Sequence, residues 1–149
     1  MPSGVPSFHD TTKFGLSMRF DVVVGGIDLG GWASCDGLSV DFGLVEIKAG
    51  GNNGYSTFTP GRLKYARLVL KRAMNAKDST KLMSWLRKMV DVTEGDAATI
   101  TLRDSHNGAV ASWTFVNVRP WLWKGPTLSA NGKDVALETL ELIHEGFLT

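Results

Sequence analysis

Cysteine, proline and unbalanced charge are all scarce in this sequence, and each shortage excludes a class of protein. Cys35 is the only cysteine among 149 residues, so an internal disulfide is impossible and a reduced or redox-indifferent setting is expected. Five prolines against 17 glycines indicate many turns. The 16 basic and 15 acidic residues leave a formal charge of +1. No overall field therefore recruits nucleic acid or an anionic membrane, and near-neutral proteins associate readily.

Long apolar runs are also missing. No stretch approaches the roughly 20 residues of a membrane span, and residues 1–10 lack the basic region and apolar core of a signal peptide. We expect a soluble protein that is made in a cytoplasm and leaves the cell by lysis or inside a particle. A hydrophobic content of 43% fits one globular domain over residues 1–149, with residues 1–15 as a flexible N-terminal arm.

Residues suited to catalysis or metal binding do not fall into a working arrangement. His9, His106 and His144 are far apart and none has a metal-ligand spacing. Cys35 is a nucleophile only if a histidine reaches it, and a buried or half-buried thiol is the more common outcome. The glycine-rich run 50–54 lacks the Lys-Ser/Thr that follows a phosphate-binding loop. We therefore expect no enzyme, no cofactor and no metal.

Alternating apolar and polar residues predict six or seven strands. A hairpin turns at Gly25-Gly26, another closes through Asn107-Gly108, and Pro120 ends a strand before an aromatic loop with Trp121 and Trp123. The expected strands are 18–24, 27–29, 38–42, 63–72, 98–103, 109–118 and 135–144. With one helix, this pattern predicts a mainly β fold, an antiparallel β-sandwich or barrel with the helix packed outside.

The predicted helix follows a short connection at 74–77. Asp78 or Ser79 is expected to cap its first turn. The spacing of three and four residues places Leu82, Trp85, Leu86 and Met89 on one apolar face.

The segment 43–61 is too long and too rich in glycine for an ordinary loop. Only residues 44–47 have strand character, yet Tyr55 and Phe58 alternate with small polar residues. A disordered linker has few aromatic residues. The segment is therefore expected to be a hairpin or a long extended arm that lies on another surface.

Two sets of charged residues are open to more than one interpretation. Glu138 and Glu141 fall on opposite faces of the last strand, so one of them is a candidate to meet a partner's basic group. A basic cluster forms either a solvated face or a salt-bridging surface for a neighbouring subunit, and it consists of Lys71, Arg72, Lys81, Arg87 and Lys88.

Short motifs in a specific order, spread over residues 16–148, resemble the tail tube proteins of contractile phages and phage-like contractile injection systems. The order begins with Phe20-x-Val22-x-Val24 and Gly37-Leu38, continues with Glu46, Pro60-Gly61 and Leu68-x-Leu70-Lys71-Arg72, and closes with a tryptophan-bearing helix and Glu138-Thr-Leu-Glu141-Leu.

The resemblance implies a subunit that forms six-membered rings, stacked into a hollow rigid tube inside a contractile sheath. Its expected partners are further copies of itself, the sheath protein, baseplate and spike hub proteins, tube paralogues and a cargo in the lumen, with no nucleic acid specificity. Assembly is expected in a bacterial cytoplasm. The candidate inter-subunit residues are Glu46, Gly50, Gly51, Asn52, Asn53, Gly54, Tyr55, Phe58, Pro60, Gly61 and Arg62.

Three alternatives stay open. The ending around Trp123 to Pro126 and His144 to Leu148 is closer to a baseplate-proximal ring that initiates the tube. A monomeric barrel that binds a small ligand would place its tryptophans around a cavity. A hydrolase would depend on Cys35 or a carboxylate pair.

Overall fold

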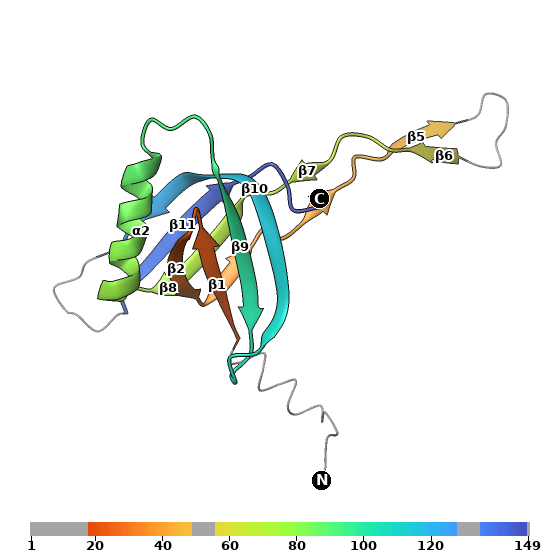
Figure 1. Cartoon of the computed structure of the whole chain (residues 1–149). Coiled ribbons are helices and arrows are strands. Elements are labelled where there is room, and N and C mark those ends of the chain that lie inside the picture. Colours follow the sequence, from red (N-terminus) through yellow and green to blue (C-terminus); the bar gives the residue numbers. More distant parts are fainter. Residues whose placement is uncertain (1–17, 49–55, 128–134, 149) are drawn as a thin grey trace, which may run out of the picture.

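The computed structural model describes residues 18–48, 56–127 and 135–148. Seven strands form one antiparallel sheet in the order β2-β1-β9-β10-β11-β8-β3, and the pairs β4-β7 and β5-β6 lie outside it (Figure 1). The elements are β1 (Arg19–Val24), β2 (Ile27–Trp32), β3 (Ser34–Asp36), β4 (Val40–Asp41), β5 (Val45–Lys48), β6 (Ser56–Thr59), β7 (Lys64–Tyr65), β8 (Leu68–Ala73), α2 (Ala76–Met89), β9 (Asp96–Arg103), β10 (Ala109–Lys124) and β11 (Leu137–Ile143). The predicted antiparallel, mainly β fold is confirmed.

The seven-stranded sheet curls into a barrel because its two end strands are consecutive in the chain. Only Ala33 separates β2 from β3, and its backbone N–H donates to the carbonyl of Lys71 on β8 at 2.9 Å. β2 thus pairs with β1 at one end of the sheet, and β3, which follows it directly, pairs with β8 at the other end. Closure of this kind leaves few unpaired strand edges on the barrel.

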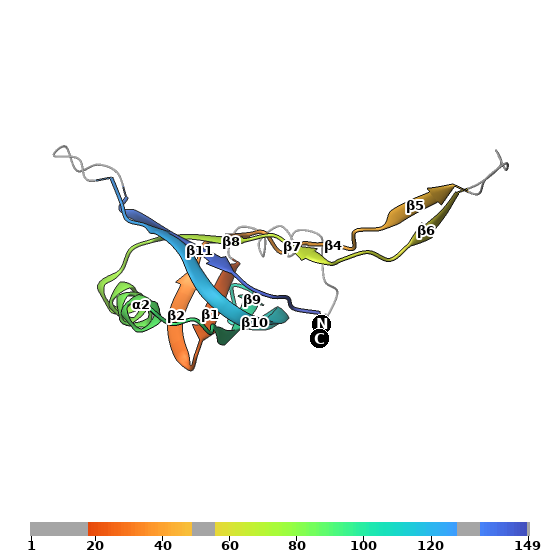
Figure 2. The ribbon, with the colours of Figure 1, turned by 90° about the horizontal axis from the view of Figure 1, so that it is seen from above.

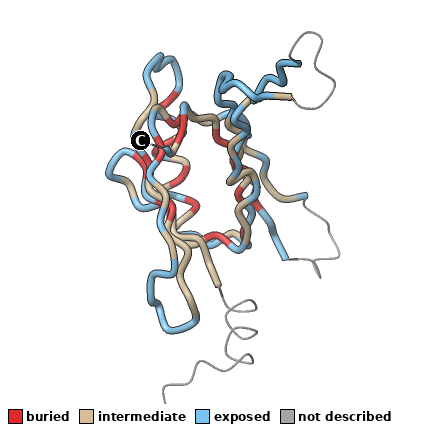
Figure 3. Tube along the Cα trace, turned by 90° about the vertical axis from the view of Figure 1, so that its right-hand side faces the viewer, coloured by how far each residue is buried: buried red, intermediate tan, exposed pale blue. Residues whose placement is uncertain are grey.

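The core fills the barrel and continues under the helix. Buried residues line the inside of the barrel wall, whereas the turns at its ends are exposed (Figure 3). Trp32 of β2, Trp85 of α2 and Phe115 of β10 are the largest fully buried side chains. Trp85 also donates from Nε1 to Asp96 Oδ2 at 3.0 Å, which ties the helix to β9.

The predicted apolar face of the helix is confirmed, but its predicted cap is wrong. Leu82, Trp85 and Met89 are buried. The cap is Asn75, which has extended backbone angles and accepts a hydrogen bond from Asp78 N at 2.8 Å. Asn75 Nδ2 also donates to Asp78 Oδ2 at 3.1 Å. Asparagine is as good a helix cap as aspartate. The helix therefore begins at Ala76, before the acidic residue from which its start was predicted.

The predicted strand 63–72 is two strands, β7 and β8, separated at Ala66 and Arg67. β8 pairs with β11 and β3 in the barrel, whereas β7 pairs only with β4 outside it. At the separation the chain passes Gly37, whose φ is +95° and where a Cβ would lie 1.9 Å from the Arg67 carbonyl oxygen. The backbone crossing at Gly37 therefore interrupts an otherwise continuous pattern.

Pro120 does not end β10, which continues to Lys124, so the aromatic loop predicted from Trp121 and Trp123 is part of the strand. The pairing of β10 with β9 ends at Val118, and Pro120 lies beside an irregularity in the pairing with β11. A proline is tolerated in a strand where no ladder bond is required of its nitrogen. Trp121 is exposed and Trp123 is half-buried.

The remaining differences are at strand ends. The Gly25-Gly26 and Asn107-Gly108 hairpins are confirmed, and the first of them continues to Trp32. The predicted strand 38–42 shrinks to β4, because Gly37 and Gly43 have positive φ and turn the chain on either side. β3 was not predicted, since Ser34 to Asp36 carries no apolar alternation. The last strand, predicted over 135–144, is β11.

Candidate assembly surfaces

A two-stranded ribbon projects from the barrel and is the most exposed element of the fold (Figures 1 and 2). We call residues 42–48 and 56–63 the arm. β5 and β6 pair antiparallel along it, and β4 and β7 connect it to the barrel. All four residues of β5 are exposed. The prediction that the segment 43–61 forms a hairpin or extended arm is thereby confirmed for its described residues.

The arm exposes more apolar surface than a free ribbon can stabilise. Phe58 is 61% exposed and Leu44 is 59% exposed, and Phe42, Val45 and Ile47 are also largely in solvent. An isolated two-stranded hairpin is marginally stable in water. Contiguous exposed apolar residues of this kind mark a binding surface. The arm thus has the composition of a segment that docks on something.

Two glycines allow the strands of the arm to cross at its base. A Cβ on Gly61 would lie 2.0 Å from the carbonyl oxygen of Gly43, and one on Gly43 would lie 2.4 Å from that of Arg62. Gly43 also has a φ of +61°, and its N–H donates to Asp41 Oδ1 at 2.8 Å. Any side chain at Gly61 would separate the strands. The Pro60-Gly61 corner thus holds the arm against its own base.

The other predicted assembly residues divide into two groups. Glu46 lies on β5 directly opposite Phe58, and its Oε1 accepts a hydrogen bond from Ser56 Oγ at 2.6 Å. Pro60 and Arg62 are exposed at the base. Gly50, Gly51, Asn52, Asn53, Gly54 and Tyr55 lie outside the described residues.

Arg72 and Glu138 do not form a surface for a partner, because they form an ion pair inside the barrel. Arg72 Nε donates to Glu138 Oε2 at 2.8 Å, and their side chains are 3% and 0% exposed. Ser79 Oγ donates to the same oxygen at 2.7 Å, and Trp123 Nε1 donates to Glu138 Oε1 at 3.0 Å. The solvated and partner-facing interpretations of Arg72 are both wrong. The four side chains connect α2, β8, β10 and β11.

Arg72 has two further contacts within the core. Its Nη1 donates to the Leu29 carbonyl, and its guanidinium lies 3.9 Å from the centre of the Trp32 ring. A cation over a tryptophan face is attracted by the ring quadrupole. Sequence reasoning missed this network because the only signal for it is register, which places Arg72 opposite Glu138 across β8 and β11.

Glu141 also finds a basic residue of its own chain. Its Oε1 lies 3.8 Å from Arg67 Nη1, on the outer face of the sheet. Arg67 in turn lies 4.8 Å from the centre of the exposed Trp121 ring. Exposed pairs of this geometry contribute little to stability, so the residues are available for other contacts.

Cys35 lies on β3 between Ser34 and Asp36. Burial, together with a smaller contribution from the neighbouring Asp36 carboxylate, raises the pKa of the Cys35 thiol to about 12. The half-buried thiol expected from the sequence is confirmed, and its nucleophilic thiolate is suppressed. No group of three or more His, Cys, Asp or Glu side chains suited to a metal ion occurs in residues 18–48, 56–127 and 135–148.

His144 is enclosed by aromatic rings at the base of the arm. Its ring centre lies 5.4 Å from that of Tyr65 and 4.8 Å from that of Phe115, and Phe147 completes the cluster. Nδ1 accepts from Gly146 N at 3.1 Å. Burial lowers the pKa of His144 below its ordinary value, although a hydrogen bond with the backbone of Ala66 opposes the shift. The neutral ring therefore acts as one more aromatic packing group.

Trp32 and Trp85 pack in the core instead of lining a cavity, unlike the tryptophans of the ligand-binding barrel considered above. No described helix has the length and apolar composition to cross a membrane.

A filled barrel with a projecting apolar ribbon defines a subunit built for assembly. Comparison with curated proteins gives no match. The model of the family described as T4-like virus tail tube protein gp19 matches residues 16–148, and the chain belongs to this family of tail tube proteins.

Several solved structures contain chains of similar fold. One, in the sheath–tube complex of the extracellular contractile injection system PVC in its extended state, has a TM-score of 0.69 and 21% identity, with 87% of this chain and 86% of that chain covered. Another, in the baseplate of the anti-feeding prophage, has a TM-score of 0.66 and 22% identity, with 98% and 95% covered. Hcp1 from Salmonella typhimurium has a TM-score of 0.58 and 13% identity, with 86% and 82% covered.

Proposed function

We propose that this tail tube protein forms six-membered rings that stack into a hollow rigid tube, which contraction of a surrounding sheath drives through a target envelope. Membership of the tail tube family supports the tube. The observation that carries the assembly step is the arm, because a folded barrel has no need of an exposed apolar ribbon for its own stability. The protein acts without catalysis, as one domain over residues 1–149.

The arm reaches an adjacent subunit or ring. Its paired strands present unpaired backbone edges as well as apolar side chains, so a neighbour can add a strand to it or cover it. A contact between two different surfaces of identical subunits is head-to-tail. Repeating it closes a ring when the rotation that relates one subunit to the next divides a full turn evenly. Phe58 is the anchor of this contact, with Gly50 to Gly54 permitting close approach and Tyr55 adding a second aromatic group.

Deletion of residues 51–56 tests this role of the arm. We expect a folded domain that no longer forms tubes, because the barrel core is separate from the arm. The measurement is negative-stain electron microscopy with a parallel sizing run on the wild-type and deleted proteins. Circular dichroism melting is the control for folding. Normal tubes from the deleted protein would contradict the assignment of the arm.

The sheath protein, baseplate and spike hub proteins and other tube paralogues are its proposed partners, with assembly in a bacterial cytoplasm before the particle is released. PVC and anti-feeding prophage structures that contain chains of this fold are described as sheath–tube and baseplate complexes, which supports the sheath and baseplate as partners. The Cys35→Ser variant is expected to assemble as the wild type does. An activity lost with this substitution while assembly is retained would favour the hydrolase alternative.

A baseplate-proximal ring that initiates the tube is the second candidate. The aromatic Trp123-Lys-Gly-Pro126 segment and the His144 to Leu148 ending favour it. Such a subunit is expected to remain monomeric alone and to form a single ring when its baseplate neighbour is added. A main tube subunit forms long tubes without that neighbour, so the two functions are separated by one mixing experiment with electron microscopy.

A further inference from the structure

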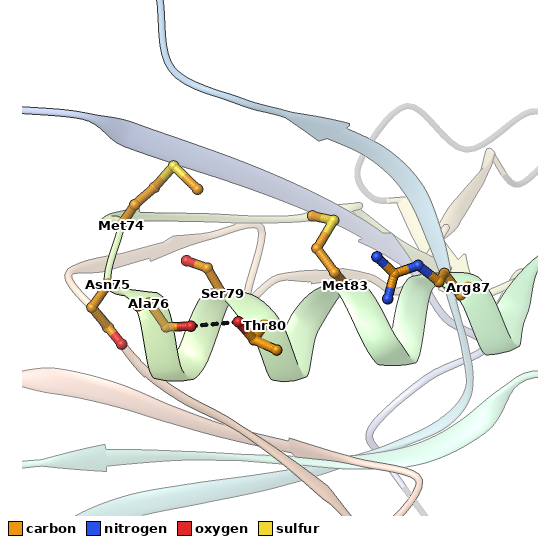
Figure 4. A pocket seen from close by; sticks show the side chains of 7 residues that line it. All are labelled: Met74, Asn75, Ala76, Ser79, Thr80, Met83 and Arg87. Atoms are coloured by element: carbon orange, nitrogen blue, oxygen red, sulfur yellow. Dashed lines mark hydrogen bonds between the residues drawn. The ribbon is translucent and has the colours of Figure 1, made fainter.

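A groove lies along α2, on a side of the barrel distant from the arm. Its volume is about 330 Å³, near the lower end of pockets that hold small molecules, about 300 Å³. Figure 4 shows Met83 and Arg87 on the same side of the helix, with the Arg87 side chain directed back toward Met83. The lining consists of Met74, Asn75, Ala76, Ser79, Thr80, Met83 and Arg87.

The groove offers an occupant methionine side chains and a positive charge. Ser79 Oγ already donates to Glu138, and Thr80 Oγ1 already donates to the Ala76 carbonyl at 2.6 Å. Arg87 is exposed and has no carboxylate within 4.0 Å among the residues that the structure describes. Methionine makes favourable sulfur contacts with aromatic rings, and a guanidinium prefers a carboxylate. A matching occupant is an aromatic side chain beside an acidic one.

The arm carries this combination. Glu46 and Phe58 are directly opposite each other across β5 and β6, so their side chains project from the same face of the ribbon. Phe58 is 61% exposed. Ser56 Oγ donates a hydrogen bond to Glu46 Oε1. The other carboxylate oxygen of Glu46 has no hydrogen bond to the described residues.

The positions of the two surfaces suit a head-to-tail contact. The arm leaves one side of the barrel and α2 covers the opposite side (Figures 1 and 2). The arm therefore cannot reach the groove of its own chain, but a second copy placed alongside can present its arm there.

We propose that the groove beside α2 receives the arm of a neighbouring copy, with Phe58 between Met74 and Met83 and Glu46 paired with Arg87. The proposal rests on the tube function proposed above and specifies where one subunit holds the next. The contact joins an apolar anchor to a charge pair at its edge, the usual anatomy of a protein interface.

Charge reversal tests the pairing. Glu46→Arg and Arg87→Glu are each expected to reduce the number of tubes in micrographs at least tenfold, because like charges then face each other. The double variant E46R/R87E is expected to restore them. Lys77→Glu, an exposed charge reversal on α2 outside the groove, is the matched control and is expected to form tubes. Single variants with normal tubes, or a double variant as defective as the single ones, would overturn the pairing.

Cross-linking in preformed tubes tests the location independently. A protein with Phe58→Cys and Met83→Cys is treated with a short bismaleimide and separated under denaturing conditions. We expect a ladder of linked subunits, and no ladder from the control pair Phe58→Cys and Val110→Cys, because Val110 is exposed on β10 and not on α2. Cys35 stays in place, since its raised pKa makes it a poor competitor.

The two tests separate the inference from the function on which it rests. Tubes that form normally but give no Phe58–Met83 ladder leave the tube function standing and overturn the groove as the docking site. A wild-type protein that forms neither rings nor tubes, with or without baseplate partners, overturns both. If the cysteine pair does not assemble, the charge-reversal series decides the proposal.

Discussion

Removing the Glu138 carboxylate should destabilise the barrel more than any change on its outer surface. Glu138→Ala leaves the Arg72 guanidinium buried with only the Leu29 carbonyl and the Trp32 ring for contact. Ser79 Oγ and Trp123 Nε1 also lose their acceptors. One substitution thus removes the side-chain contacts of Glu138 on β11 with three other elements, β8, β10 and α2.

The expected loss follows from the burial of the pair. Breaking a fully buried ion pair by removing one partner costs about 3–5 kcal/mol, because the remaining charge is uncompensated. Glu138 and Arg72 meet that condition at 0% and 3% exposure. In a domain of this size, each 1 kcal/mol lowers the Tm by about 2–4 °C, so we expect a decrease of about 6–20 °C.

Urea unfolding followed by tryptophan fluorescence measures the loss, at a concentration where sizing shows monomers, since assembly would shift the apparent stability. The matched control is Glu141→Ala on the outer face of the same strand. Its 3.8 Å pair with the half-exposed Arg67 predicts a change of no more than about 1 kcal/mol. If Glu138→Ala differs from this control by less than about 1 kcal/mol, the network does not hold the elements together and the reasoning is refuted.

Three further predictions follow from the described residues. Cys35, with a pKa of about 12, carries about three orders of magnitude less thiolate at pH 8 than a free thiol, so we expect maleimide labelling to be slow in the folded protein and rapid in urea. Because the pKa of His144 is lowered in the folded state, the unfolded chain takes up a proton first as the pH falls below 6.5. We therefore expect stability to decline over that range, with a shallower decline for His144→Phe in urea titrations at each pH. Gly61→Ala places a Cβ 2.0 Å from the Gly43 oxygen at the base of the arm, so tubes should be lost while the Tm of the barrel changes little; retained tubes would argue against a set geometry at this corner.

Periodicity within a segment was sufficient to predict most of the barrel. The alternation at 18–24, the turn at Gly25-Gly26 and the helical spacing of Leu82, Trp85 and Met89 are local, and the structure confirms each of them. These residues determine local structure by burying one face at a regular interval. The fold class follows because strands of this number and one helix have few ways to share a core.

What the sequence could not predict depends on residues far apart in the chain. Arg72 and Glu138 are separated by 66 positions, and only the register of β8 against β11 brings them together. The interruption at Arg67 likewise depends on the approach of Gly37 from a different segment. The sequence also predicted that Pro120 ends its strand. A proline is tolerated there because β10 no longer pairs with β9 beyond Val118, and this depends on the strand pairing and not on the local sequence.

The candidate site shows the same division. Composition was enough to predict the arm, and Phe58 on it is exposed, whereas its role as an anchor stays a prediction. The need for glycine at Gly61 follows only from the crossing with Gly43. The groove beside α2 was not predicted. Met74 was assigned to a connection and Met83 to a helix with the wrong start, so the sequence did not indicate that the two residues line one groove.

The separation of a closed barrel from an uncovered ribbon has a consequence for the time course of polymerisation. The barrel buries its core within one chain, so a subunit can accumulate fully folded before any neighbour is present. Docking fixes the position of the ribbon and its exposed side chains, and the entropy lost in this step is offset by the contacts that a preformed ring supplies at once. The first ring has no such template. Growth on an existing end is therefore faster than the start of a new tube, which places control of tube number with whatever supplies the first ring.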